Sequence, residues 1–244
     1  MRLRRSLLTL VAVAALGLGG GVIVSCAHLS GQTKYVDPST LVLERVLPPP
    51  PADGSPMERA ELDEMLRIQS ARTPAQAERA KEDAQISVFR LGDALGSPAD
   101  FNSTRLPRVA ALFDKLRMAE AAVMGAAKNS FHRKRPYDVD AQVKPVISHL
   151  DSLSYPSGHA TWAFASGYVL ADMVPEKRAE ILARAAEYAR NRTVAGVHYP
   201  SDVDAGRISG SVLAAFLFAS PEFRAEEQQA AAELRSALKL PTLQ

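Results

Sequence analysis

The chain has 244 residues, of which 47% are hydrophobic and 23% are charged, so it can form one folded domain with a substantial core or two small ones. Its formal net charge is +2, and Arg2, Arg4 and Arg5 supply three of the positive charges. Subtracting these three from +2 leaves a net charge of −1. That value argues against a nucleic-acid-binding protein that works through a broad basic surface.

Residues 1–25 have the pattern of a secretory signal peptide, because three arginines precede an uncharged apolar stretch from Leu7 to Val24. The eighteen residues of this stretch are also just enough to span a bilayer as an uncleaved anchor. Glycines at positions 17, 19, 20 and 21 would weaken a permanent helix, so we favour cleavage and export.

Cys26 is the single cysteine of the chain, so an intrachain disulfide is excluded. The segment Ile23-Val24-Ser25-Cys26 resembles the box in which bacterial lipoproteins are modified, which would make Cys26 a lipid anchor to a membrane. The alternative is ordinary cleavage after Ala27, with Ser25-Cys26-Ala27 as the small-residue site. Both alternatives predict a periplasmic protein, and the first adds attachment to a membrane by lipid.

Residues 26–54 have few periodic apolar positions and contain four consecutive prolines, Pro48 to Pro51, which predicts an extended arm before the folded domain. The domain itself is expected over residues 55–240. Ser55, followed by Pro56 and by Glu58 three residues later, has the pattern of a capping box and predicts the first helix.

The segment Thr73-Pro74-Ala75-Gln76 repeats this helix-start pattern and predicts a second helix that runs to about Leu95. This second helix carries several carboxylates that we expect to lie on a face exposed to solvent. They are Glu78, Glu82 and Asp83.

The rest of the chain also has helical periodicity. A long helix is expected from about Leu106 to Ser130, and a loop without regular structure from Pro136 to Pro156. Further helices are expected over 160–173, 175–191, from about 201, and 221–238. No alternating strand pattern and no internal repeat occurs, so we predict an all-α fold with a single compact multi-helix domain. Past residue 26, no apolar run is long enough to predict a membrane span.

Two cations near the end of the long predicted helix are candidates for anion binding. Lys128 and Arg135 are seven residues apart, so they would point the same way if the helix persisted. Arg135 precedes Pro136, which disfavours helical backbone at Arg135 and leaves its guanidinium free to hold an oxyanion through two parallel hydrogen bonds. In the alternative interpretation, Arg133-Lys134-Arg135 only stabilises the helix C-terminus.

The segment Pro156-Ser157-Gly158-His159 precedes a strongly apolar helix. Free N–H groups at a helix N-terminus, with a glycine that permits close approach, form an anion-binding site. Ser157 could instead be an ordinary N-cap followed by an incidental histidine. Because the helix dipole lowers the pKa of a histidine in the first turn, we expect His159 to carry a proton only beside a bound phosphate or in acid.

The third segment contains Arg192, His198 and Asp202. His198 and Asp202 are four residues apart, so the Asp202 carboxylate can accept a hydrogen bond from one imidazole nitrogen. That bond would fix the tautomer and leave the other nitrogen as a nucleophile. The alternative is a His–Asp pair on the surface without a catalytic role.

Together the three segments read Lys-x6-Arg-Pro, Pro-Ser-Gly-His and Arg-x5-His-x3-Asp, in this order. This pattern resembles the bacterial class A non-specific acid phosphatases, within the phosphatidic acid phosphatase type 2 superfamily that also includes the vanadium haloperoxidases. The motifs cover residues 128–202, and the resemblance extends over about 45–220. It implies an exported acid phosphatase that hydrolyses a broad range of phosphomonoesters, and phosphate transfer to alcohols as a side activity.

The resemblance also implies roles for the motif residues. His198 would be the nucleophile that forms a phosphohistidine, Asp202 would orient it, and His159 would protonate the leaving alkoxide and then activate water. No metal or other cofactor is implied, and His28, His132 and His149 form no ligand cluster with spaced carboxylates. A homodimer is the expected assembly. The groups expected to hold the phosphoryl oxygens are Lys128, Arg135, Ser157, Gly158 and Arg192.

The chain departs from the family pattern at two positions. Asn191 stands where serine usually precedes the arginine, and Ala160 follows the motif histidine where threonine is common. We expect both changes to tune the surroundings of the site and to leave activity intact. The alternatives to a soluble-substrate phosphatase are a lipid phosphatase at the membrane surface, a haloperoxidase, and a phosphate-binding surface protein without turnover. Binding alone needs neither His159 nor His198, which argues against the last.

Overall fold

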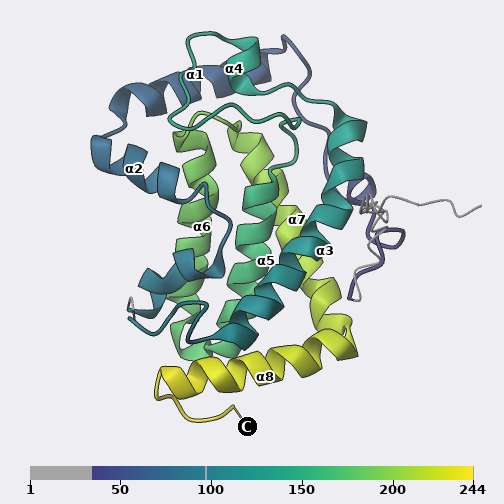
Figure 1. The fold of residues 1–244 in the computed structure, drawn as a ribbon. Helices are drawn as coiled ribbons and strands as arrows, with labels where there is room; N and C mark the ends of the chain where they lie inside the picture. The colour runs from purple at the N-terminus through teal and green to yellow at the C-terminus, as the bar shows by residue number, and fades with distance from the viewer. Residues whose placement is uncertain (1–34, 97, 244) are drawn as a thin grey trace, which may run out of the picture. The chain divides into compact units, whose positions relative to one another are not determined.

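All regular structure in the described part of the chain is helical, as the periodicity predicts (Figure 1). The computed structural model describes residues 35–96 and 98–243, so the predicted signal peptide, Cys26 and His28 lie outside the described residues. The α-helices are α1 (Pro56–Ala71), α2 (Pro74–Glu82), α3 (Pro107–Phe131), α4 (Pro136–Val139), α5 (Gly158–Met173), α6 (Arg178–Val194), α7 (Pro200–Ala219) and α8 (Pro221–Ala237). Three 3-10 helices join them: η1 (Leu43–Arg45), η2 (Val88–Leu95) and η3 (Pro175–Lys177).

The first two helices begin where the sequence predicts, and side chains satisfy their free N–H groups. Thr73 and Gln76 form a complete capping box, in which each side chain accepts a hydrogen bond from the backbone N–H of the other residue. Ser55 Oγ accepts from the N–H of Glu58 at 3.1 Å. The Glu58 carboxylate accepts from the N–H of Gly54, one residue earlier than a capping box would have it.

The second helix is shorter than predicted, because it ends at Glu82 and the chain continues as η2 after a break. Glu78 and Glu82 are exposed as expected, but the expectation that Asp83 faces solvent is wrong. Its carboxylate is fully buried and accepts hydrogen bonds from Arg184 at 2.5 and 3.0 Å and from Asn191 at 2.7 Å. These partners lie on α6, about a hundred residues later, so no local pattern could reveal them.

The arm before α1 packs onto the domain over its described part. Leu41, Leu43 and Leu47 are buried in the main core, and η1 lies against α3. Pro48 follows directly, and its carbonyl accepts a hydrogen bond from the Tyr155 hydroxyl at 2.5 Å. The arm therefore contacts the segment that leads into Ser157.

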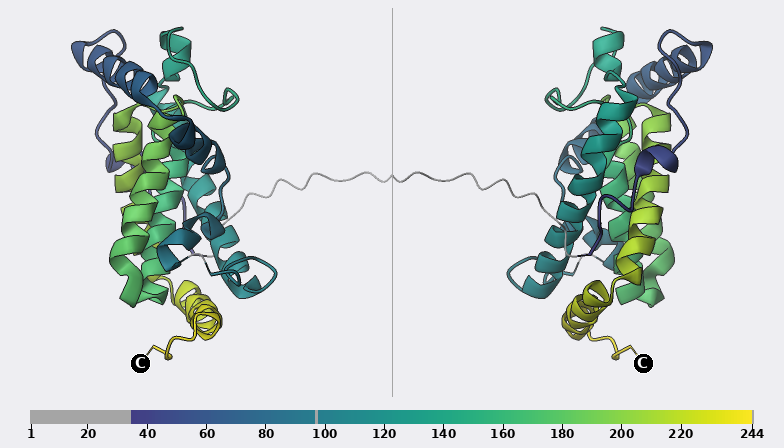
Figure 2. Two further views of the ribbon diagram at one scale, coloured as in Figure 1. Left: turned by 90° about the vertical axis from the view of Figure 1, so that its left-hand side faces the viewer. Right: turned by 90° about the vertical axis from the view of Figure 1, so that its right-hand side faces the viewer.

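Helix α5 is the centre of the bundle and contacts α3, α6, α7 and α8 (Figures 1 and 2). Its residues are apolar on every side, which matches a helix surrounded by others. Two glycines of α7 let α7 approach α5 closely: a Cβ at Gly206 would lie 2.5 Å from the Cβ of Ala160, and one at Gly210 would lie 2.5 Å from the carbonyl oxygen of Thr161. This close packing brings the N-terminal ends of α5 and α7 together, and the N–H of Ser157 donates to the carbonyl of Asp202 at 3.0 Å.

The segment from Pro136 to Pro156 contains the short helix α4, which the sequence did not predict. Proline at its first position suits a helix start. The segment then runs over the ends of α6 and α7, below α1 in Figure 1, where Val143 and Tyr137 join a small second core with residues of α1 and of the α6–α7 connection. It thereby covers the end of the bundle at which α5 and α7 begin.

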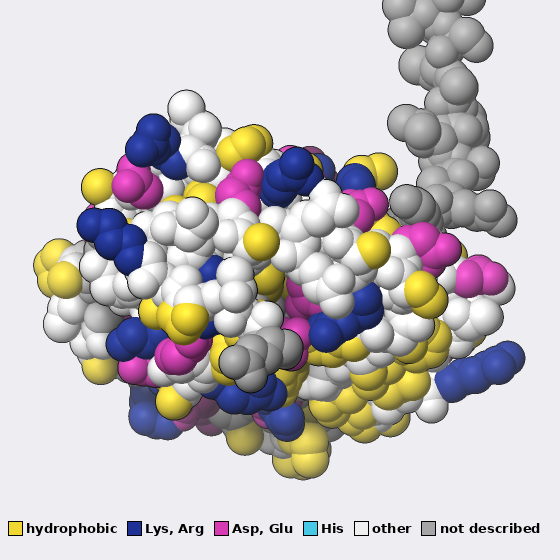
Figure 3. Space-filling model, turned by 90° about the horizontal axis from the view of Figure 1, so that it is seen from below, with side chains coloured by type: hydrophobic (Ala, Val, Ile, Leu, Met, Phe, Trp, Pro, Cys, Tyr) yellow, Lys and Arg dark blue, Asp and Glu magenta, His cyan; other side chains and the backbone are white. Residues whose placement is uncertain are grey.

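The face seen from below carries positive and negative side chains interspersed, with hydrophobic side chains gathered at one side (Figure 3). It shows no broad field of one sign. Within the described residues no single helix is long and apolar enough to cross a membrane; α7 and α8 reach that length only as a pair, bent by 95° at their junction.

Candidate active site

The three sequence segments converge at one end of the bundle. Five elements contribute: the last turn of α3 holds Lys128, and Arg135 directly precedes α4. Ser157, Gly158 and His159 begin α5, Arg192 lies in the last turn of α6, and the α6–α7 connection leads through His198 to Asp202. The long helix does not persist to Arg135, since it ends at Phe131 and His132 takes a left-handed conformation with φ 50°. The turn that follows, rather than helical spacing, brings Lys128 and Arg135 to the same site.

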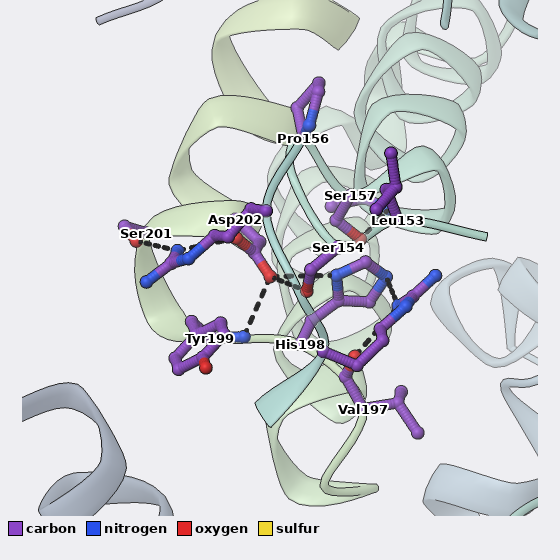
Figure 4. A network of polar contacts seen from close by, with 12 residues as sticks. Leu153, Ser154, Pro156, Ser157, Val197, His198, Tyr199, Ser201 and Asp202 are labelled. Carbon is purple, nitrogen blue, oxygen red and sulfur yellow. Dashed lines mark hydrogen bonds and ion pairs between the residues drawn. The ribbon is translucent and has the colours of Figure 1, made fainter. Parts of the chain in front are cut away.

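His198 is held by a hydrogen bond on each ring nitrogen (Figure 4). Nδ1 lies 3.1 Å from Oδ2 of Asp202, and Nε2 lies 2.8 Å from Nη1 of Arg135. A guanidinium can only donate, so Nε2 must be the acceptor and the ring proton must reside on Nδ1, where it is donated to Asp202. Burial, with Arg135 as the largest charged contribution, lowers the pKa of His198 well below 6.5. The imidazole is therefore neutral, with the lone pair of Nε2 directed at Arg135.

The Asp202 carboxylate is fully buried and accepts three further hydrogen bonds. Its donors are the Ser154 hydroxyl at 2.5 Å, Arg133 Nη1 at 2.7 Å and the N–H of Tyr199 at 3.0 Å. The Tyr199 bond is local, because Asp202 is the third residue of α7 and reaches back to cap it. With both oxygens occupied, the carboxylate has one fixed orientation toward His198.

Arg133 is a site residue that the sequence did not identify. Its buried guanidinium connects Asp202 with Glu61 of α1 at 2.7 Å and stacks on the Tyr199 ring, with 3.7 Å between the Arg133 Cζ and the ring centroid. In the sequence, Arg133 belongs to the cluster Arg133-Lys134-Arg135, which by itself predicts only stabilisation of the helix C-terminus. Its acidic partners are 72 and 69 residues away, and only its nearness to the Arg-Pro motif could have drawn attention to it.

Arg192 is the clearest candidate for binding an anion. Its side chain is fully buried, and none of its three guanidinium nitrogens has a hydrogen-bond partner among the described residues. Burial lowers the pKa of Arg192 to about 10, so the group still carries its charge. An unpaired buried charge is costly unless a partner of opposite charge can approach it.

Lys128 and Arg135 supply two more cations, and neither forms an ion pair within the described residues. Lys128 Nζ donates to the carbonyls of Leu153 at 2.7 Å and Pro156 at 2.8 Å, both in the turn that leads into Ser157. Burial, and next the charge of Arg135, lower the pKa of Lys128 to about 7. Arg135 donates to Ser152 and to the Val197 carbonyl, in addition to His198. Together with Arg192, the site has an excess of positive charge suited to an oxyanion.

Ser157 caps α5, since its Oγ accepts a hydrogen bond from the N–H of Ala160 at 3.3 Å. The N–H groups of Gly158 and His159 lie in the first turn, where no intrahelical acceptor exists. The cap role and the anion-site role, stated above as alternatives, are therefore compatible. The hydroxyl serves the cap while the next two amides remain to be satisfied.

His159 contacts the α2–η2 connection and α6, with Nε2 3.0 Å from the carbonyl oxygen of Ala84 and its ring stacked with Tyr188 at 6.4 Å between centroids. Since a carbonyl only accepts, Nε2 carries the proton in this arrangement and Nδ1 is the acceptor. Burial, and next the charge of Arg192, lower the pKa of His159 to about 3. The expected direction is correct, but the larger causes are burial and a neighbouring cation.

The two departures from the family pattern occupy defined places. Asn191 is buried and donates to Asp83, which also binds Arg184. These hydrogen bonds fix the position of the residue that precedes Arg192. Ala160 is buried against the close approach of Gly206, where its small side chain fits. His132 and His149 are exposed, and the indole of Trp162 is buried in the core.

No group of three histidine, cysteine, aspartate or glutamate side chains is placed to hold a metal ion anywhere in residues 35–96 and 98–243.

The chain is similar to several known proteins. The model of the PAP2 superfamily matches residues 116–226, a range that contains every candidate site residue from Lys128 to Asp202. The chain is 29% identical to an acid phosphatase of Zymomonas mobilis over 92% of this chain and 90% of that protein. It is 30% identical to a non-specific acid phosphatase of Providencia stuartii over 76% of this chain and 77% of that protein.

A shorter match exists to a lipid A 1-phosphatase of Rhizobium johnstonii, at 38% identity over 31% of this chain and 32% of that protein. The two longer matches extend over most of both partners, so they describe the whole domain and not only the motifs. The chain therefore belongs to the PAP2 superfamily, alongside the bacterial non-specific acid phosphatases.

Proposed function

We propose that this acid phosphatase hydrolyses phosphomonoesters through a phosphohistidine on His198. The observation that carries the proposal is the pair of hydrogen bonds on His198: Asp202 holds Nδ1–H, so the lone pair of Nε2 faces the cluster of cations. A phosphoryl group bound by those cations lies in front of a nucleophile that is neutral and correctly oriented.

In the first step, the Nε2 lone pair forms a bond to phosphorus and the bond from phosphorus to the ester oxygen breaks. His159 donates its proton to the leaving alkoxide, which departs as an alcohol. The bound phosphate supplies the negative charge that His159 needs to hold a proton at acid pH, against the pKa of about 3 that burial and Arg192 impose.

In the second step, His159 accepts a proton from water, the water oxygen attacks phosphorus, and the bond to Nε2 breaks. Inorganic phosphate leaves and His198 returns to its neutral form. An alcohol in place of water would yield a new phosphomonoester, which is the proposed phosphotransferase activity.

Lys128, Arg135, Arg192 and the amides of Gly158 and His159 stabilise the charge on the phosphoryl oxygens during both steps. They contact the phosphoryl group and leave the rest of the substrate outside, which is the basis for a broad range of phosphomonoesters. The proposed location is the periplasm, either with ordinary signal cleavage or with a lipid on Cys26 that attaches the protein to a membrane.

The test is hydrolysis of p-nitrophenyl phosphate at acid pH by wild type and by His198→Ala. We expect the variant to lose activity, and we expect a ³²P label to stay on the acid-quenched wild-type protein but not on the variant. His149→Ala is the matched control, because His149 is exposed, stacks on Tyr137 and has no role in the proposed mechanism. Turnover that disappears with EDTA, or phosphate binding without any labelled intermediate, would contradict the mechanism.

A lipid phosphatase is the second candidate, favoured by the match to the lipid A 1-phosphatase over part of the chain. Rates on soluble phosphomonoesters and on phosphatidic acid in mixed micelles distinguish the two. Faster turnover of the lipid would assign the protein to membrane substrates.

A further inference from the structure

Glu120 is a buried carboxyl at the site that the proposed mechanism does not use. It lies on α3 with 7% of its surface exposed, and it makes no hydrogen bond or close ion pair with a described residue. Burial raises the pKa of Glu120 to about 7, so the group is neutral in acid and ionised above neutrality. At 7% exposure the carboxyl is largely removed from water, which disfavours its charged form.

The carboxyl lies directly against the start of α5. Its Oε1 is 2.9 Å from the position that a Cβ at residue 158 would take, so any other residue there would require the carboxyl to shift. Gly158 is also the residue whose N–H is proposed to bind the phosphoryl group. Lys128, further along α3, donates to the Pro156 carbonyl two residues before Gly158. Glu120 and Lys128 thus flank the same turn.

The charged groups that act on Glu120 are Lys128 and Arg117, both from α3 itself. From α5 the nearest titratable group in the motif is His159, whose pKa of about 3 keeps it neutral in the empty site. A bound anion favours its protonated form in acid, in Glu120→Gln as in wild type. Helix α8 also packs on α3, where Glu233 accepts from the backbone N–H of Arg108 and Glu226 pairs with Lys115. None of these groups acts on Glu120. The 3-10 helix η1 carries Glu44 and Arg45, neither of which acts on Glu120.

We propose that Glu120 is a positioning residue that makes oxyanion binding at Lys128 and Gly158 depend on pH. As a neutral acid, Glu120 leaves the positive charge of the site intact and has a proton to donate to a bound oxygen. As a carboxylate, it repels the anion and pairs with Lys128. The proposal rests on the proposed function in one respect, that this site binds phosphoryl oxygens. It assigns the tighter binding of the oxyanion in acid to the Glu120 side chain.

Lys128 itself titrates near neutrality and could weaken anion binding at high pH without Glu120. The two explanations predict opposite effects for Glu120→Gln. If the Glu120 carboxylate repels the anion, its removal strengthens binding above neutrality. If loss of the Lys128 proton is the cause, removing a negative neighbour lowers the pKa of Lys128 further and weakens binding.

The experiment measures the affinity for inorganic sulfate by calorimetry at pH 5.5 and pH 8, because sulfate is tetrahedral and keeps its charge over this range. At pH 8 we expect Glu120→Gln to bind sulfate about tenfold more tightly than wild type, the effect of about one pKa unit of charge interaction. At pH 5.5 the two proteins should agree within about threefold.

Glu227→Gln is the matched control. Glu227 is also buried, and burial raises its pKa to about 7, but it lies on α8 beside Arg224. This variant should leave sulfate affinity unchanged at both pH values. Equal or weaker binding by Glu120→Gln at pH 8 would overturn the proposal, and so would an equal change at both pH values, which indicates a structural role. Failure of wild type to bind sulfate at either pH would overturn the oxyanion site and with it the proposed function.

If Glu120→Gln does not fold, ¹³C-glutamate NMR of the wild-type protein provides the same test. We expect two carboxyl resonances that titrate near neutrality, from Glu120 and Glu227, and only one of them should have its titration midpoint moved to higher pH by saturating sulfate. That resonance should persist in Glu227→Gln. If no glutamate resonance responds to sulfate in this way, the proposal is wrong.

Discussion

At the scale of single residues, the buried arginines of the site differ in whether they have an acidic partner. Arg133 is paired with two carboxylates and stacked on Tyr199, so it is a fixed structural cation. Arg192 is equally buried and has no hydrogen-bond partner among the described residues. Because desolvating a guanidinium without compensation is expensive, the fold must stabilise Arg192 by other interactions until an oxyanion binds. Arg133 therefore holds the site together, while Arg192 is the arginine left available for the proposed anion.

The role of His159 leads to a prediction about leaving groups. His159→Ala should lower kcat by roughly 10²- to 10⁴-fold for alkyl phosphates, since their alkoxides need a proton to leave. The loss should be smaller for p-nitrophenyl phosphate, whose phenolate leaves without one. Steady-state kinetics with both substrates check this expectation, with the exposed His132→Ala as control. Equal losses for the two substrates would show that His159 does not act as the acid.

At the scale of helices, the site depends on how closely α5 and α7 approach. The Ser157 amide donates to the Asp202 carbonyl, so a backbone hydrogen bond joins the turn proposed to bind phosphate to the His198–Asp202 pair. Gly206 and Gly210 make this contact possible, since a Cβ at either would overlap α5. The glycines in α7 are therefore explained by packing between helices and not by a bend in α7.

The α5–α7 contact predicts the effect of Gly210→Ala. The added methyl would lie 2.5 Å from the Thr161 carbonyl oxygen, a backbone atom that cannot move alone. We expect a loss of about 1–3 kcal/mol in the free energy of unfolding, measured by urea denaturation. Gly125→Ala on α3 is the control, because a Cβ added at residue 125 would have no atom within 4 Å. This variant should be more stable than wild type by about 0.5–1 kcal/mol through helix propensity. Equal effects for the two variants would contradict the packing explanation.

At the scale of the whole molecule, buried titratable groups link stability to pH. Burial raises the folded-state pKa of Glu227 from 4.5 to about 7. The folded state therefore holds a proton that the unfolded state releases, and the resulting stability is present below about pH 4.5 and is lost as pH rises toward 7.

This linkage predicts a pH-dependent difference between wild type and Glu227→Gln. At pH 5 the two should have similar free energies of unfolding, while at pH 8 wild type should be less stable by about 1–3 kcal/mol. Urea denaturation at the two pH values measures the change. Glu222→Gln, at an exposed position on the same helix, is the control for loss of a surface carboxylate. A constant difference for Glu227→Gln would show that the carboxyl does not titrate in this range.

Much of this protein follows from the sequence by itself. The helices begin at Ser55, Thr73, Ser157 and Ser220 because a side-chain oxygen caps the free N–H groups there, which is a local effect that four residues encode. The all-α fold follows from apolar periodicity, and the family follows from the spacing of the three motifs. The pairing of His198 with Asp202 is also local, since both lie in the turn that starts α7.

Only the tertiary structure decided the rest, because the deciding partners are far apart in sequence. Asp83 turns inward to Arg184 and Asn191, which ends α2 early, and Arg133 joins α1 to Asp202. Glu120 is one charged residue on a long helix until α5 places Gly158 against it. Burial, and with it the pKa of each of these groups, is a property of neighbours that no local pattern specifies.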